Sequence, residues 1–312
     1  MTSHSTQKPR ILWLGAPDSC NALVNALLAQ CERRAQLSKQ GKVVAPRLPS
    51  RRLNEILGGG LPVGLTVLHG APGAGKSAFA LQCACECGCP ALIISAELPV
   101  TELLLRITAR VNGKPRRELQ YMPRDQLEPL LMRAVQASPH LGVVDLTRYA
   151  PPTNAEQGNG LQELLAQFTE AVLEYNARDV QAPYPLLVVD SVHTVARLAG
   201  DAYTREYDLL TGALTYLDML ARYHGVAVLG IAERNREAMQ GGGLTAAAGH
   251  RLFEYIAEAM LSLDVERDQN GEMKRINDDM VLMKVRVLKN RNGEIGEVPV
   301  TFDGKRMRFT EG

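Results

Sequence analysis

Short apolar runs alternate along the chain with longer segments in which apolar residues recur every three or four positions. The runs predict buried strands, and the longer segments predict amphipathic helices. The strands are expected at 65–69, 91–95, 142–145, 186–190, 226–231, 259–265, 281–288 and 297–302. Helices are expected after 76, from 100, around 161–175 and over 207–223. This alternation predicts an α/β fold, in which helices cover both faces of a mostly parallel, twisted sheet.

The last two predicted strands flank residues 289–296, with the turn-rich sequence KNRNGEIG. Two strands joined by such a segment are typical of a β-hairpin. We therefore expect a C-terminal antiparallel hairpin at one end of the sheet.

The N-terminal part has a different pattern from the rest. Residues 11–15 read as a strand and 19–38 as an amphipathic helix, and the basic, Pro-containing sequence GKVVAPRLPSRR follows. This sequence is typical of a linker. We expect a small N-terminal segment over 1–48 and the main domain over 49–312. The helix could pack on the main domain or dock a partner such as a loader.

Composition narrows these possibilities. A chain of 312 residues with 46% hydrophobic content can form one large domain, with or without a small appendage. Its 35 Lys and Arg nearly balance 34 Asp and Glu, so any nucleic-acid binding must come from local patches. The apolar run ILWLGA is too short for a signal sequence or a membrane span. We expect a cytoplasmic protein without membrane contact.

Four cysteines alternate at Cys83, Cys85, Cys87 and Cys89, in a stretch expected to be helical as far as about residue 87. Paired zinc ligands are usually separated by about two or more residues. Alternating positions on a helix point to different faces. The pattern therefore favours packing of small side chains over metal binding.

One segment carries a specific chemical signal, because it matches G-x-x-x-x-G-K-[ST] between a predicted strand and a predicted helix. Its residues are Gly70, Ala71, Pro72, Gly73, Ala74, Gly75, Lys76 and Ser77. Glycines let backbone N–H groups point at phosphate oxygens, at a helix N-terminus that attracts anions. Lys76 is expected to reach the β- and γ-phosphates of ATP, and the Ser77 hydroxyl to bind Mg²⁺.

Two carboxylates follow predicted strands and complete the expected site. Asp190 ends the apolar run LLVVD, as the magnesium-binding Asp of a Walker B strand does. Glu97 lies at the end of the predicted strand at 91–95, in LIISAELP, and is our candidate for orienting or deprotonating the attacking water. The alternatives are an Asp that simply ends a strand and a Glu that caps the next helix.

The order and spacing of Lys76, Glu97 and Asp190 resemble the RecA superfamily of P-loop NTPases. In AAA+ proteins an acid directly follows the Walker B Asp, whereas this chain has Ser191 there. The segment LNEILGGGLPVGLTVLHGAPGAGKS is similar to the entry of RadA and KaiC ATPases. The C-terminal run VRVLKNRNGEIGEVPVTFDGKRMRFTE resembles DnaB-type replicative helicases more narrowly.

The DnaB resemblance implies an ATP-dependent helicase or translocase that works in DNA replication. It further implies a homo-oligomeric, hexameric ring around single-stranded DNA, with ATP between subunits. Lys289 and Arg291 would then reach the γ-phosphate of a neighbouring subunit, Arg291 as an arginine finger. The alternative for both is a basic hairpin turn.

The chain departs from the DnaB pattern at two places. DnaB proteins carry a sizeable helical domain before the ATPase domain and use it to dock primase, whereas about 50 residues stand there in this sequence. Glu233 occupies the place of a Gln that senses the γ-phosphate in the family. A carboxylate would repel phosphate, so either the sensor has moved to Asn235 or the coupling is altered.

Two segments are candidates for binding single strands, at 197–205 and 236–251. The second combines glycines with Arg236, His250 and Arg251, which could neutralise phosphates without reading sequence. A plain surface loop is the alternative. A RecA- or KaiC-like regulatory ATPase, which controls assembly without unwinding, is the competing function for the whole chain.

Overall fold

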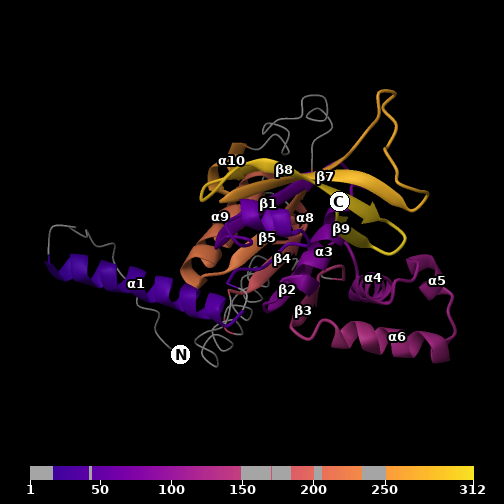
Figure 1. Ribbon diagram of the computed structural model, residues 1–312, viewed down its shortest axis with the longest axis horizontal. Helices are drawn as coiled ribbons and strands as arrows, with labels where there is room; N and C mark the ends of the chain where they lie inside the picture. Colours follow the sequence, from indigo (N-terminus) through magenta and orange to yellow (C-terminus); the bar gives the residue numbers. More distant parts are fainter. Residues whose placement is uncertain (1–16, 42–43, 149–169, 171–183, 200–205, 234–250) are drawn as a thin grey trace. The chain divides into compact units, whose positions relative to one another are not determined.

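A computed structural model describes residues 17–41, 44–148, 170, 184–199, 206–233 and 251–312 (Figure 1). Contacts divide the chain into two units, residues 1–44 and 45–312. In the first unit, the helix expected at 19–38 is helix α1, Pro17–Lys39. The strand expected at 11–15 and nearly all of the helix expected around 161–175 lie outside the described residues.

The second unit is built on a sheet whose described strands lie in the order β3-β2-β4-β5-β1-β6-β7-β8-β9. Neighbours from β3 to β6 are parallel, and neighbours from β6 to β9 are antiparallel. The strands are β1 (Gly64–Gly70), β2 (Ala91–Ser95), β3 (Leu141–Asp145), β4 (Leu186–Asp190), β5 (Ala227–Glu233), β6 (Ala259–Val265), β7 (Met280–Asn290), β8 (Gly296–Asp303) and β9 (Arg308–Glu311). The predicted fold class and the C-terminal hairpin, formed by β7 and β8, are confirmed.

Helices cover both faces of the sheet, as the buried strands require. Successive residues of a strand face opposite sides, and Val67 and Leu68 of β1 accordingly join two different hydrophobic cores. Leu68 packs in the core that includes α3, whereas Val67 packs in the core that includes α8 and α9. The helices are α2 (Arg51–Ile56), α3 (Lys76–Glu86), α4 (Val100–Asn112), α5 (Arg116–Gln120), α6 (Arg124–Gln136), α8 (Val192–Ala199), α9 (Glu206–His224) and α10 (Arg251–Ile256).

Helix α3 is fixed against the C-terminal strands. The ring of Phe79 meets that of Phe309 edge-on, with centroids 5.2 Å apart, and Phe302 stacks on Phe309 at 4.3 Å. The Gln82 amide donates to the Phe309 carbonyl at 3.0 Å and accepts from the Phe309 N–H at 2.7 Å. The loop that leads into α3 is therefore anchored by residues more than 200 positions later in the sequence.

The alternating cysteines contribute to the packing of α3 and of the residues after it. Cys83, Cys87 and Cys89 are buried in the same core as Leu68, and Cys85 is partly buried beside it. The predicted packing of small side chains agrees with this burial. Within the described part of the chain, no helix has both the length and the apolar character needed to cross a membrane.

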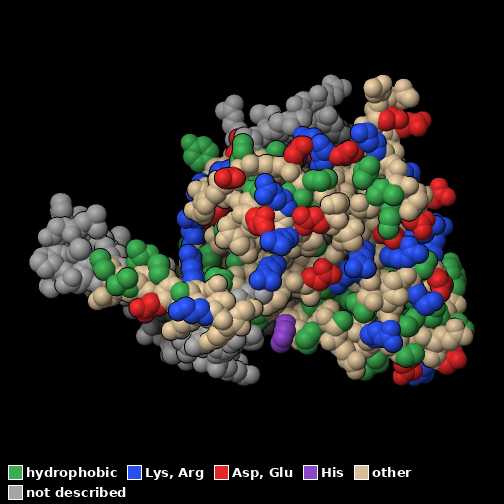
Figure 2. Space-filling model, in the orientation of Figure 1, with side chains coloured by type: hydrophobic (Ala, Val, Ile, Leu, Met, Phe, Trp, Pro, Cys, Tyr) green, Lys and Arg blue, Asp and Glu red, His purple; other side chains and the backbone are tan. Residues whose placement is uncertain are grey.

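Charged side chains of both signs are interspersed on the face shown in Figure 2. Charges of opposite sign also pair along strand β7, where Lys284 pairs with Glu297 at 2.8 Å and lies 3.7 Å from Glu266. This mixture agrees with the formal net charge of +1, and the visible face therefore carries no extended field of a single sign.

Candidate nucleotide-binding site

The carboxyl ends of the parallel strands meet at one edge of the sheet and bring distant residues together. Ser95 at the end of β2 lies level with Asp190 at the end of β4, and Gly70 at the end of β1 lies level with Glu233. Glu97 stands two residues after the end of β2. This edge is where open α/β sheets usually bind ligands.

The loop between β1 and α3 has a conformation that requires glycine. Gly75 has φ 88° and caps the N-terminus of α3, and a Cβ there would lie 3.1 Å from Cζ of Phe309. A Cβ on Gly70 would lie 2.5 Å from the Leu263 carbonyl oxygen. The sequence thus places the backbone N–H groups at the start of α3 around an anion-binding cradle.

Lys76 folds back over this loop. Its Nζ donates hydrogen bonds to the carbonyl oxygens of Gly70 at 3.0 Å and Ala71 at 3.1 Å. The ammonium group is therefore held against the start of the loop, and Lys76 lines the cavity beside it.

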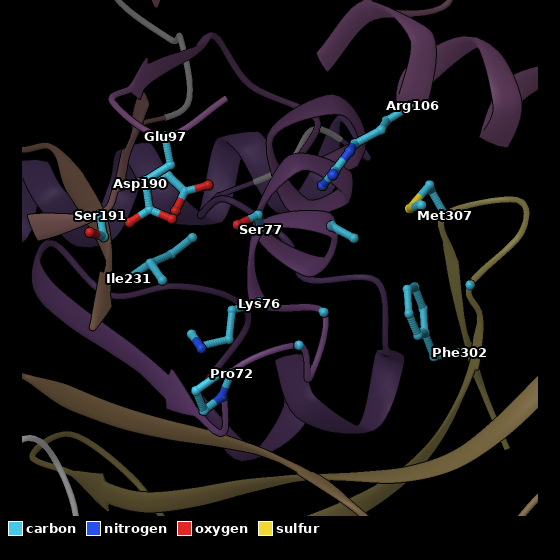
Figure 3. A pocket seen from close by; sticks show the side chains of 14 residues that line it. Pro72, Lys76, Ser77, Glu97, Arg106, Asp190, Ser191, Ile231, Phe302 and Met307 are labelled. Carbon is cyan, nitrogen blue, oxygen red and sulfur yellow. The ribbon is translucent and has the colours of Figure 1, made fainter. Parts of the chain in front are cut away.

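A cavity of about 400 Å³ opens beside the loop (Figure 3). Seven of the predicted site residues line it: Pro72, Gly73, Gly75, Lys76, Ser77, Glu97 and Asp190. Gly70, Ala71 and Ala74 do not line it, since the first two present carbonyls to Lys76 and Ala74 is buried. The motif and the two acids, predicted separately from the sequence, therefore share one cavity.

The two acids differ in environment although they lie side by side and point toward Ser77 in Figure 3. Asp190 is buried, and this burial raises its pKa to about 6, although a hydrogen bond from Ser77 opposes the shift. Its Oδ1 has no hydrogen-bond partner among the described residues. Glu97 is exposed to the cavity, and its Oε1 accepts a hydrogen bond from Thr194 Oγ1 at 3.3 Å.

The residues around Asp190 fit a magnesium ion. Mg²⁺ prefers hard oxygen ligands and is usually held by one or two protein groups together with substrate phosphates. Here a buried carboxylate with an unpartnered oxygen lies against the Ser77 hydroxyl. Ser77 and Asp190 are therefore the residues that would hold the ion.

Arg106 is a cavity residue that the sequence reasoning missed. It extends from α4 into the cavity in Figure 3, and its Nε donates to Glu102 Oε1 at 2.8 Å. Arg116 donates to the same carboxylate at 3.1 Å. One negative charge is thus shared by two guanidinium groups, which leaves a net positive charge near the phosphate cradle. The only sequence signal was the Glu102–Arg106 spacing of one helical turn.

The end of β8 and the turn between β8 and β9 form the opposite wall of the cavity (Figure 3). Phe302, Gly304 and Met307 line that wall, and none of them was predicted. The Lys305 carbonyl accepts a hydrogen bond from the Arg116 N–H at 2.8 Å, and Arg306 Nε donates to the Gly113 carbonyl at 2.9 Å. The β8–β9 turn and the α4–α5 turn are therefore tied together.

Lys289 and Arg291 lie at the opposite end of the sheet from the cavity, near the amino ends of the parallel strands. Lys289 is level with Met260, near the start of β6, whereas β1 and β6 run in parallel toward the loop at Gly70. Lys289 Nζ donates to the carbonyls of Glu254 and Ala257. The structure does not bring either cation to the cavity of its own chain, and Lys289 lies in β7 rather than in the hairpin turn.

The remaining candidates are only partly described. Glu233 ends β5 beside Gly70, but its side chain lies outside the described part. Asn235, Arg236 and His250 also lie outside it, and Arg251 is described only as the first residue of α10. The structure therefore leaves the sensor and the DNA-binding residues as predictions.

Comparison with known proteins gives structural matches only. No protein-family model and no curated protein sequence matches the chain. A solved ATPase domain is similar with TM-score 0.70 and 15% identity, over 96% of this chain and 99% of that one. A DnaB-like replicative helicase, solved in a study of its interactions with primase, is similar with TM-score 0.68 and 16% identity, over 92% of this chain and 66% of that one.

A KaiC-like protein from Pyrococcus horikoshii OT3 is similar with TM-score 0.53 and 17% identity, over 87% of this chain and 99% of that one. The structural similarity shows a common fold, and at identities this low it shows the fold alone. The chain has the RecA-like α/β fold that is also found in a DnaB-like replicative helicase and in a KaiC-like protein.

Proposed function

We propose that this chain is an ATPase that works as a DnaB-like helicase or single-stranded DNA translocase. The observation that carries the proposal is the shared cavity of Lys76, Ser77, Glu97 and Asp190. Together they match three requirements of ATP hydrolysis: Lys76 binds phosphate, Ser77 and Asp190 bind the metal, and Glu97 activates water.

The chemistry follows from the positions of these side chains. Lys76 and the N–H groups of the loop bind the phosphates, and Arg106 adds positive charge from the opposite side. Ser77 and Asp190 would hold Mg²⁺, and the ion would supply positive charge beside the phosphates. Glu97 orients a water molecule and accepts its proton as the water oxygen attacks the γ-phosphorus. The bond to the β-phosphate oxygen breaks, and ADP and inorganic phosphate leave.

The site would be shared between two copies of the chain. Lys289 and Arg291 lie at the sheet edge remote from their own cavity, so they could act only on a nucleotide bound by another copy. A closed ring, hexameric by analogy, gives every cavity such a neighbour. Single-stranded DNA would pass through the ring, with Arg236, His250 and Arg251 as candidate contacts, and residues 1–48 could dock a loader.

A RecA- or KaiC-like regulatory ATPase is the second candidate function. Glu233 favours it, because a carboxylate level with Gly70 would repel the γ-phosphate that a Gln would sense. In this case nucleotide would control assembly with DNA or protein partners without unwinding.

The experiment that tests the proposal measures ATP hydrolysis against protein concentration, with and without single-stranded DNA. We expect the rate per chain to rise with concentration and with DNA. Displacement of a strand from a forked duplex then separates the two functions. ATPase activity without displacement, over a range of salt and fork lengths, would support the regulatory ATPase.

A further inference from the structure

The short helix α10 ends in carbonyl groups that hold the two cations of the C-terminal hairpin. Lys289 donates to the carbonyls of Glu254 and Ala257, and Arg291 Nη2 donates to the Tyr255 carbonyl at 2.5 Å. Cations commonly satisfy the last carbonyls of a helix in this way. Arg291 also contacts a side chain, since its Nη1 donates to Glu258 Oε1 at 3.3 Å.

Glu258 is held more firmly than the arginine it contacts. Its side chain is 10% exposed, compared with 41% for Arg291. Its N–H donates to the Leu65 carbonyl at 2.8 Å, and its carbonyl accepts from the Arg291 N–H at 2.9 Å. Gly64 makes room for it, since a Cβ there would lie 2.5 Å from Glu258 Cγ. The carboxylate is therefore a fixed support beneath a partly exposed guanidinium.

The negative charge of Glu258 is shared between two arginines, Arg291 and Arg222. Arg222 donates from Nη2 to Glu258 at 2.7 Å and from Nε to both oxygens of Asp218, at 3.0 and 2.9 Å. Asp218, Arg222, Glu258 and Arg291 thus form a chain of alternating charges. A guanidinium has five N–H donors. The contacts with Glu258 and Tyr255 leave Arg291 donors for an incoming phosphate.

We propose that Glu258 is a positioning residue for Arg291, one that orients the guanidinium toward a phosphate bound by a neighbouring copy. The inference rests on the proposed sharing of the site. A long side chain loses conformational freedom when it binds a phosphate, and an arginine already fixed by Glu258 and Tyr255 loses less. Glu258 itself stays buried and does not touch the nucleotide.

Complementation between two inactive chains tests this role. Arg291→Ala supplies an intact cavity, Lys76→Ala supplies an intact Arg291, and the two are reassembled together. Glu258→Met or Glu258→Gln is then added to the Lys76→Ala chain. Met keeps the length but removes both acceptors, whereas Gln keeps one. We expect rescued ATPase activity to fall roughly tenfold with Met and less with Gln, as loss of a charge-assisted hydrogen bond implies.

The matched control carries the same Glu258 substitutions in the Arg291→Ala chain. Because that chain contributes only the cavity, its rescue by Lys76→Ala should remain. Equal losses in both arrangements, or no loss in either, would overturn the positioning role. If the two parent chains give no rescue at all, the shared site itself is wrong, and the proposed function fails together with the inference.

Discussion

Thr194 donates a hydrogen bond from its Oγ1 to the carboxylate of Glu97 at 3.3 Å, across the carboxyl ends of β2 and β4. The same hydroxyl lies 3.0 Å from Ser191 Oγ, so the start of α8 holds the acid that faces the cavity. Thr194 thus connects the candidate catalytic acid with the residue that follows Asp190.

Replacing the acid should separate binding from hydrolysis. We predict that Glu97→Gln lowers the rate of ATP hydrolysis by about 100-fold or more while nucleotide binding remains, because the amide cannot accept the proton of water. Thr194→Val should lower the rate of hydrolysis less, because it removes only the hydrogen bond that positions Glu97. Glu128→Gln, on an exposed face of α6, is the control. Unchanged hydrolysis by Glu97→Gln would remove Glu97 from the mechanism.

Replacing the buried Asp190 should raise the stability of the protein and lower its activity. We predict that Asp190→Asn raises the melting temperature of the nucleotide-free protein by roughly 2–4 °C, because it removes a buried charge whose Oδ1 has no described partner. The same variant should lose magnesium-dependent hydrolysis. Thermal unfolding with and without Mg²⁺ measures the change in stability, and an ATPase assay with Mg²⁺ measures the loss of hydrolysis. A lower melting temperature in the absence of metal would show that the carboxylate is already well paired.

Arg106 and Arg116 offer a matched pair, because both donate to Glu102 but only Arg106 lines the cavity. We predict that Arg106→Ala weakens ATP binding by about 10- to 100-fold, as expected for loss of a hydrogen bond to a charged group. Arg116→Ala should have a much smaller effect. Titration of each variant with ATP and with AMP measures its affinity for the nucleotide. Equal weakening for both nucleotides would argue against contact between Arg106 and the terminal phosphates.

Gly75 and Gly113 both have positive φ, at 88° and 64°, but differ in the space around them. A Cβ on Gly113 would meet nothing within 4 Å, whereas one on Gly75 would press on Phe309 and Phe302. Gly113→Ala should cost about 1–2 kcal/mol in the free energy of unfolding. Gly75→Ala should cost more and also abolish nucleotide binding. Chemical denaturation and a binding assay test the pair, and equal costs would contradict the account.

The sequence predicted the parts of the site that depend on local patterns. The segment from Gly70 to Ser77 is contiguous, so its motif shows without knowledge of the fold. Glu97 and Asp190 follow apolar strands, and parallel strands bring their carboxyl ends together. The strand pattern was equally informative, because every predicted strand from 65–69 to 297–302 lies on an observed one.

The parts that the sequence did not predict depend on how elements dock. Arg106 enters the cavity because α4 packs beside α3, and Phe302 and Met307 enter it through a hairpin distant in sequence. Helices α5 and α6 were not predicted, because Pro115 and Pro123 stand at their N-caps and Pro129 lies inside α6, where proline usually breaks a helix. The contacts of Glu258 could not be predicted, since its partners lie on α9 and after β7.

The central claim is that one copy supplies the cavity and another supplies Arg291. It is tested most directly by the ATPase activity of Lys76→Ala and Arg291→Ala, measured separately and after joint reassembly. The account predicts that each variant alone is inactive and that the mixture recovers part of the activity, because mixed interfaces contain one intact cavity and one intact arginine. An Arg291→Ala chain with full activity on its own would contradict it.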